Sequence, residues 1–135
     1  MFSLIIFLII KVREIKENLK IDFKHKRGKG IFRILEFEDH GHHIVYIPSL
    51  KLSSYGNTVE DAQKMMGDIV LEDFFENLFE QPENVILDYL KNLGWSKSSI
   101  YPKELSNNVH IDTDGILKNF NLSSNTKITE KLVEV

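Results

Sequence analysis

The sequence contains no cysteine, and this absence removes several kinds of chemistry at once. A chain without thiols forms no disulfide, builds no thiolate metal site and has no cysteine nucleophile. The sequence also shows no internal repeat and no low-complexity tract. The lack of cysteine fits a reducing compartment, and we therefore expect a cytoplasmic protein.

An apolar run of membrane-spanning length is also missing. Residues 2–10 are almost purely apolar, but Lys11 ends the run, whereas a transmembrane helix needs roughly 20 such residues. A signal peptide would begin with basic residues and end at a small-residue cleavage site, and neither feature is present. Three interpretations of residues 1–17 remain: a translation start placed too early, a membrane-dipping anchor, or a buried β-strand. We favour the first and then the third, and we expect no membrane association.

Charge is distributed unevenly along the chain, although the net charge is only −3. Residues 1–33 carry nine Lys/Arg and three Asp/Glu, whereas residues 34–93 carry three Lys/Arg and twelve Asp/Glu. Residues 94–135 carry five of each. Such a block pattern indicates charged partners more than the net charge does. Acids that merely solvate outer helix faces would explain the same pattern equally well.

The first half of the chain reads as short strands. Residues 19–25 alternate apolar and polar side chains, as a half-buried strand does. We expect a loop at 26–30, a second strand at 31–38 and a hairpin turn at 39–42, where Gly41 supplies a positive φ. Strands at 43–47 and 52–55 are expected to follow.

Helical signals begin at Thr58, whose hydroxyl is placed to cap a first-turn amide. Apolar residues then recur at helical spacing and predict a buried stripe: Ala62, Met66, Ile69, Val70, Phe74 and Leu78. Pro82 suits the first turn of a second helix, with Val85, Ile86, Tyr89, Leu90 and Leu93 on one face. Gly94 is expected to end that helix and Trp95 to fold back onto it.

The segment after Trp95 is polar and weakly patterned. Asp112 or Thr113 is expected to cap a short helix that carries Ile116, Leu117 and Phe120, and a strand through residues 127–135 is expected to follow. Strands first and helices after them predict an α+β fold, with an antiparallel sheet of three to four strands and the helices packed on one face. We assign residues 18–95 to this domain and 96–135 to a C-terminal extension of uncertain structure.

The stretch from Ile44 to Ala62 resembles the signature of HicB-type antitoxins. That family has a strand ending in a Tyr-x-Pro-x-Leu element, a short strand, a Gly-Asp/Asn-Thr turn and an acidic helix start. The matching positions are Tyr46, Pro48, Leu50, Tyr55, Gly56, Asn57, Thr58, Glu60 and Ala62. The resemblance covers roughly residues 31–80. Two features depart from the family pattern: Leu50-Lys51-Leu52 replaces a Pro-Gly-Cys-like step, and residues 95–135 show no helix-turn-helix or ribbon-helix-helix segment.

The resemblance implies a partial, HicB-like version of the ribonuclease H fold without catalysis. It also implies a partner, a small basic HicA-type ribonuclease toxin that is neutralised by occlusion. The residues expected to bind this partner are Tyr46, Pro48, Tyr55, Glu60, Asp61, Asp68, Glu72, Asp73 and Glu76. Short strands with polar edges predict a homo-oligomer. Operator DNA binding is not expected, because no basic recognition helix is present.

The sequence gives weaker support to functions other than binding a toxin. A solitary HicB-like domain with a different partner or a structural role is one alternative. Clustered strand carboxylates such as Glu36 and Glu38 would suit a metal-dependent nuclease, but solvent-facing acids are commoner, so we expect no enzyme and no cofactor. The histidines at 40, 42 and 43 are expected to form a polar turn rather than a metal site. Weak contact with nucleic acid is an alternative for the cations Lys24, Lys26, Arg27 and Lys29.

Overall fold

The computed structural model describes residues 3–5, 17–98, 104–107 and 112–135. Its elements are, in chain order, β1 (Ser3–Ile5), β2 (Asn18–Asp22), β3 (Arg27–Asp39), β4 (His42–Ile47), β5 (Leu52–Gly56), α2 (Val59–Met65), the π-helical turn η1 (Met66–Val70), α3 (Leu71–Leu78), α4 (Glu83–Asn92), β6 (Trp95–Lys97), β7 (Glu104–Asn107), α5 (Thr113–Asn119) and β8 (Thr129–Glu134). Within these ranges no helix combines the length and the apolar character needed to cross a bilayer.

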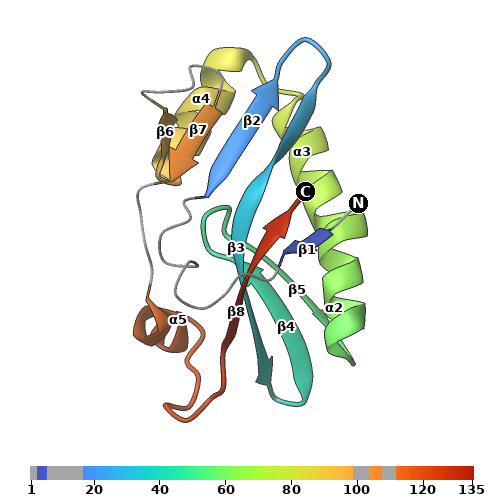
Figure 1. The fold of residues 1–135 in the computed structure, drawn as a ribbon, viewed down its shortest axis with the longest axis vertical. Coiled ribbons are helices and arrows are strands. Elements are labelled where there is room, and N and C mark those ends of the chain that lie inside the picture. The colour runs from blue at the N-terminus through green and yellow to red at the C-terminus, as the bar shows by residue number, and fades with distance from the viewer. Residues whose placement is uncertain (1–2, 6–16, 99–103, 108–111) are drawn as a thin grey trace.

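Strand β3 organises a single sheet. One of its edges pairs with β8, while the other pairs first with β2 and then with β4. The described strands number eight and join antiparallel, with β1 beyond β8, β7 and β6 beyond β2, and β5 beyond β4. Figure 1 shows β3 running through most of the molecule, with the β2–β3 hairpin at one end and the β3–β4 hairpin at the other.

The expected fold is correct as an α+β class but wrong in its architecture. We predicted three to four strands with helices on one face, whereas the described sheet has eight strands and helices lie on both faces. The difference comes mostly from the segment that begins at Trp95, which contributes β6, β7, α5 and β8, and one further strand, β1, lies near the N-terminus. Of these, β8 lies between β3 and β1 in the sheet. Pairing between residues about a hundred positions apart leaves no local signal in the sequence.

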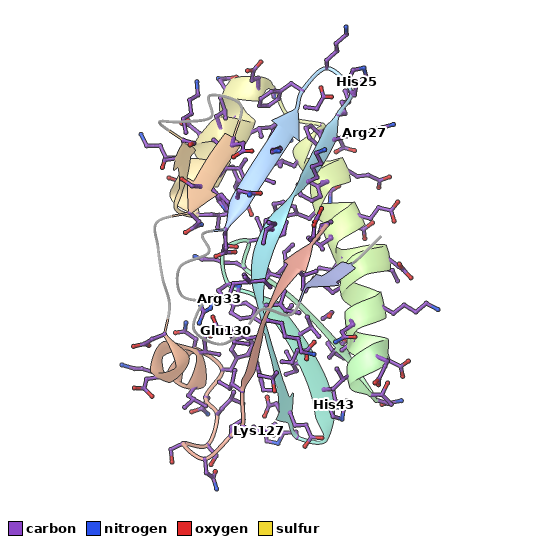
Figure 2. All side chains as sticks on the ribbon, in the orientation of Figure 1. His25, Arg27, Arg33, His43, Lys127 and Glu130 are labelled. Carbon is purple, nitrogen blue, oxygen red and sulfur yellow. The ribbon has the colours of Figure 1, made fainter. Side chains whose placement is uncertain are left out.

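Each face of the sheet has its own hydrophobic core, because side chains alternate along β3. Phe32 and Ile34 belong to the larger core, which also contains residues of α2, η1, α3 and α4. Leu35 and Phe37 belong to a smaller core that also contains Ile116 of α5. Arg33 points to this second side and forms an ion pair with Glu130 of β8 (Figure 2).

The local turn and cap predictions are mostly confirmed. His40 and Gly41 both have positive φ, 50° and 81°, in the β3–β4 hairpin, as a two-residue turn of this kind requires. The Thr58 side chain accepts a hydrogen bond from the Asp61 amide. Gly94 has φ +99° after α4. Trp95 is buried against Phe32, and its indole N–H donates to the Ser49 carbonyl at 2.9 Å.

The C-terminal predictions are confirmed as well. Asp112 caps α5, because its carboxylate accepts a hydrogen bond from the Gly115 amide at 2.8 Å. The expected final strand is present as β8. At the other end of the chain, residues 3–5 form β1 and pair with β8. The rest of the apolar run, residues 2 and 6–10, lies outside the described residues.

The expected loop at residues 26–30 is wrong. The turn falls at residues 23–26, and Lys26 takes the positive φ, 53°. Both glycines lie inside β3, where they allow close contacts rather than a turn. A Cβ at Gly28 would lie 2.4 Å from the Phe75 ring, and one at Gly30 would lie 2.0 Å from the Asn18 carbonyl oxygen.

The helix after Thr58 is continuous but contains the π-helical turn η1. A π turn contains more residues than an α turn, so the positions that face the sheet are shifted by one residue along the sequence after it. Ala62 and Met66 are buried before the slip and Leu71 is buried after it, whereas Val70 is only partly buried against the same core. Ile69, which we predicted in the core, is 49% exposed.

Candidate protein-binding surface

The helix formed by α2, η1 and α3 presents a row of carboxylates to solvent. All six acids that were predicted on this helix are exposed, and together they are called the acidic face: Glu60, Asp61, Asp68, Glu72, Asp73 and Glu76. Within the described part of the chain, none of them forms an ion pair. Figure 2 shows that side chains on the outer side of this helix project away from the sheet.

Two large apolar side chains lie among these acids. Met65 is 39% exposed and Ile69 is 49% exposed, and both are brought to the solvent side at the junction of α2 and η1. Apolar side chains surrounded by charged ones are typical of protein-binding surfaces, which have a hydrophobic centre and a polar rim. From the sequence, Met65 was not singled out and Ile69 was placed in the core. Gly67, a poor helix former inside a helix, is the signal nearest to the π turn that exposes Ile69.

Two of the predicted partner-binding residues lie in the interior. Tyr46 is 8% exposed and packs edge-to-face on Phe120, with 4.8 Å between the ring centroids. Burial raises the pKa of the Tyr46 phenol. Pro48 is buried as well. The structure therefore gives both residues a packing role and leaves neither on the acidic face.

Tyr55 is 68% exposed but lies on the other side of the sheet. It is directly opposite Ile44 in the β4–β5 pair, and Ile44 packs on the smaller core beneath α5. Directly opposed residues of paired strands share one face, so Tyr55 points away from α2. The structure does not bring Tyr55 together with the acidic face.

The four cations suggested for nucleic-acid contact gather at one end of the molecule. Lys24, Lys26, Arg27 and Lys29 are all exposed on the β2–β3 hairpin, and Figure 2 shows Arg27 and His25 near its free end. The turn is held by the Asp22 carboxylate, which accepts from the His25 amide at 3.1 Å and lies 2.7 Å from His25 Nδ1. These hydrogen bonds lower the pKa of Asp22.

A groove lies along the junction of this hairpin with α3 and α4, where Gly28 packs against the Phe75 ring, and it is called the hairpin groove. It has a volume of about 1600 Å³, above the roughly 300–1,000 Å³ of small-molecule sites, so its size suits a macromolecular segment. Its apolar lining comes from Ile21, Phe23, Phe75, Phe79, Leu87 and Leu105. The four hairpin cations and the carboxylates of Glu72, Glu76, Glu80 and Glu83 also line it.

The residues considered for metal chemistry are engaged elsewhere. Glu36 is 6% exposed, and its carboxylate binds Lys131 Nζ at 2.8 Å and Gln63 Nε2 at 2.6 Å. It thereby ties β8 and α2 to β3. Glu38 lies 3.1 Å from His43 Nε2. In the described ranges no three His, Asp or Glu side chains gather closely enough to hold a metal ion.

Comparison with known proteins gives no family: no family model, no curated protein and no solved structure matches this chain.

Proposed function

We propose that this chain is a protein-binding domain that docks a small basic protein on its acidic face. The observation that carries the proposal is the exposure of Met65 and Ile69 within a row of carboxylates that lack ion pairs among the described residues. The acids would attract a basic partner, and the two apolar side chains would supply the desolvated centre of the interface.

The two kinds of residue would make different contributions to binding. Rim carboxylates act mainly on the association rate and make it sensitive to salt. Buried apolar anchors act mainly on the dissociation rate, because their contacts form only in the docked complex. Charge reversal on the acidic face should therefore slow association, whereas truncation of Met65 and Ile69 should speed dissociation.

The resemblance of residues 44–62 to HicB-type antitoxins suggests the nature of the partner. In that case the chain would act in the cytoplasm, and docking would cover the active site of a small basic ribonuclease toxin. This role needs no catalytic group on the chain itself. A gene for a small basic protein beside the gene for this chain would identify the partner to test.

The experiment is co-expression and pull-down of the chain with that neighbouring product, together with rescue of cell growth. We expect the native chain to bind and to restore growth, and the double substitution Met65→Ser, Ile69→Ser to weaken binding by about tenfold or more. The matched control is Val85→Ser, Tyr89→Ser, which removes two α4 side chains of similar exposure, 41% and 45%, and should leave binding intact. Absence of binding and of rescue by the native chain would refute the proposal.

A further inference from the structure

Strand β5 leaves an open edge on the sheet. Among the described residues it pairs with β4 alone. The helix that follows covers one face of β5, because α2 and η1 both contact the strand and Ser54 Oγ donates a hydrogen bond to the Ala62 carbonyl at 2.6 Å. Figure 1 shows β5 and α2 side by side. An open edge is a template on which another strand can pair.

The edge of β5 lacks the features that usually prevent such pairing. Monomeric proteins protect open edges with charged side chains, proline or bulges, whereas β5 reads Leu-Ser-Ser-Tyr-Gly and pairs with β4 in continuous register. Ser53 and Tyr55 are both exposed. The terminal strand β6, in contrast, has only three residues and carries Lys97. Strand β5 is therefore the described strand best suited to receive another.

The register shows which backbone groups of β5 face the open edge. Hydrogen-bonded and non-hydrogen-bonded residue pairs alternate along an antiparallel pair of strands. Ile47 and Leu52 are the last pair before the loop. A non-hydrogen-bonded pair there would need the N–H of the next residue, and Pro48 has none, so this pair is hydrogen-bonded. The alternation then directs the N–H and C=O groups of Ser53 and Tyr55 away from β4, toward the open edge.

Part of the acidic face lies along one flank of this edge. A Cβ at Gly56 would lie 2.7 Å from the Asp61 Cβ, so Asp61 is on the β5 side of the helix. Gln63 reaches the other way, to the Glu36 carboxylate on β3. Met65 comes four residues after Asp61 and therefore shares its side of the helix. An acid and an exposed apolar side chain thus border the edge on this flank.

Tyr55 lies on the opposite flank of the same edge. It points to the side of the sheet away from α2, is 68% exposed and lies beside the His42 ring, with 6.2 Å between the ring centroids. Side chains of a strand added to β5 would alternate between the two faces. One set would contact Asp61 and Met65, and the other would contact Tyr55. A strand in this position would bring Tyr55 and the acidic face into one interface.

We propose that the partner docks by adding an extended, basic segment to β5 as a further strand of the sheet. The proposal rests on the protein-binding function proposed above and specifies how the acidic face is used. Charge complementarity selects the occupant, because the helix beside the edge carries six acids and a single lysine, Lys64. Lysine or arginine side chains on that flank would meet carboxylates, with their apolar stems along Met65.

A proline at the edge tests the backbone contact. Ser53→Pro removes an N–H that β4 does not use, and proline is tolerated on edge strands, so the variant should fold, as circular dichroism checks. Ser53→Ala loses the same hydroxyl, keeps the N–H and is the matched control. The probe is an octapeptide of alternating valine and lysine, and its charge control is an octapeptide of alternating valine and glutamate.

We expect Ser53→Pro to bind the basic peptide about 5- to 10-fold more weakly than the native chain, because one main-chain hydrogen bond is lost, and Ser53→Ala to bind it as the native chain does. The acidic peptide should bind about tenfold more weakly than the basic one. Equal binding of the basic peptide by Ser53→Pro and Ser53→Ala, or equal binding of the two peptides by the native chain, would overturn the proposal.

Amide hydrogen exchange locates the bound peptide. The Ser53 and Tyr55 amides should exchange quickly in the free chain and about tenfold or more slowly with the basic peptide, whereas the Ser54 amide, which is directed at β4, should be protected in both states. Unchanged exchange at Ser53 and Tyr55 would also overturn the proposal. So would a dimer of the native chain alone that Ser53→Pro dissociates, because the edge would then belong to a second copy.

The two proposals fail separately. If the neighbouring basic protein binds the native chain and Ser53→Pro equally well, strand addition fails and docking on the acidic face stands. If that protein does not bind, while the basic peptide protects the Ser53 and Tyr55 amides, the assignment of the partner fails and the edge remains a site for a basic strand.

Discussion

The carboxylate of Glu17 accepts a hydrogen bond from the backbone amide of Arg33, with 3.0 Å between Oε2 and N. Arg33 lies in the part of β3 between Ile31, which pairs with β2, and Leu35, which pairs with β4. At this gap the carboxylate takes the place of a neighbouring strand. The same oxygen accepts from the Ser49 hydroxyl at 2.6 Å, so one side chain joins β3 to the loop after β4.

Replacement of Glu17 should therefore destabilise the sheet at its branch point. We expect Glu17→Leu to lower the free energy of unfolding by about 1–3 kcal/mol, because it leaves two donors without their acceptor. Glu17→Gln keeps an acceptor oxygen and should cost less. Urea denaturation followed by circular dichroism measures both, and equal losses for the two variants would contradict this explanation.

The glycines of β3 give a second prediction, based on what each one faces. A Cβ at Gly30 would lie 2.0 Å from a backbone oxygen, which cannot move without disturbing β2, whereas a Cβ at Gly28 would meet the side chain of Phe75. We expect both alanine substitutions to destabilise the fold by about 1–3 kcal/mol or more, with Gly30→Ala the more severe.

A double-mutant cycle separates the two cases. Phe75→Leu should relieve much of the cost of Gly28→Ala, because it removes the ring that the new methyl group meets, and it should leave the cost of Gly30→Ala unchanged. Thermal or urea unfolding of the native chain, the three single variants and the two double variants gives the coupling energies. Equal coupling of Phe75 to both glycines would show that the ring contact is not the cause.

The parts of the fold that the sequence predicts are those fixed by neighbouring residues. The His40–Gly41 turn, the Thr58 cap and the Gly94 helix end each depend on a few consecutive side chains, and all three are confirmed. The slip at η1 is different. The helical period before it predicts Ile69 in the core, and only the packing of the complete helix on the sheet shows that Ile69 is exposed and that Leu71 is buried.

Candidate sites follow the same rule. Exposure of the acidic face was predictable, because carboxylates rarely lie buried without partners. The hairpin groove could not be predicted from the sequence, because it combines cations near residue 25 with carboxylates near residue 80. Their proximity depends on the position of α3 and α4 relative to the β2–β3 hairpin, which no local pattern encodes. The interior position of Tyr46 likewise depends on α5, some seventy residues later in the chain.

The smaller core provides a third prediction. Ile116 of α5 is fully buried beneath the sheet, together with Leu35 and Phe37. We expect Ile116→Ala to lower the free energy of unfolding by about 2–5 kcal/mol, as truncations at buried sites do. Lys118→Ala, at an exposed position of the same helix, is the control and should change stability little. An unchanged stability for Ile116→Ala would mean that α5 does not pack on the sheet in solution.

The buried phenol of Tyr46 provides a fourth prediction, on alkaline stability. Burial raises the pKa of Tyr46 in the folded chain above its ordinary value of 10.0. The stabilising contribution of the neutral phenol is fully present below about pH 10 and is lost as the pH rises further, because the unfolded chain releases the proton first. Native stability should therefore fall more steeply than that of Tyr46→Phe as the pH rises above about 10.

Urea denaturation at a series of pH values measures this difference. Tyr46→Phe keeps the ring that packs on Phe120 and removes only the ionisable hydroxyl, so its neutral-pH stability should remain close to native. The control is Tyr55→Phe, which removes the hydroxyl of an exposed tyrosine and should follow the native pH profile. If the stability of the native chain and that of Tyr46→Phe change with pH in the same way, the Tyr46 hydroxyl is solvated in the folded state. That result would also mean that α5 does not cover this side of the sheet.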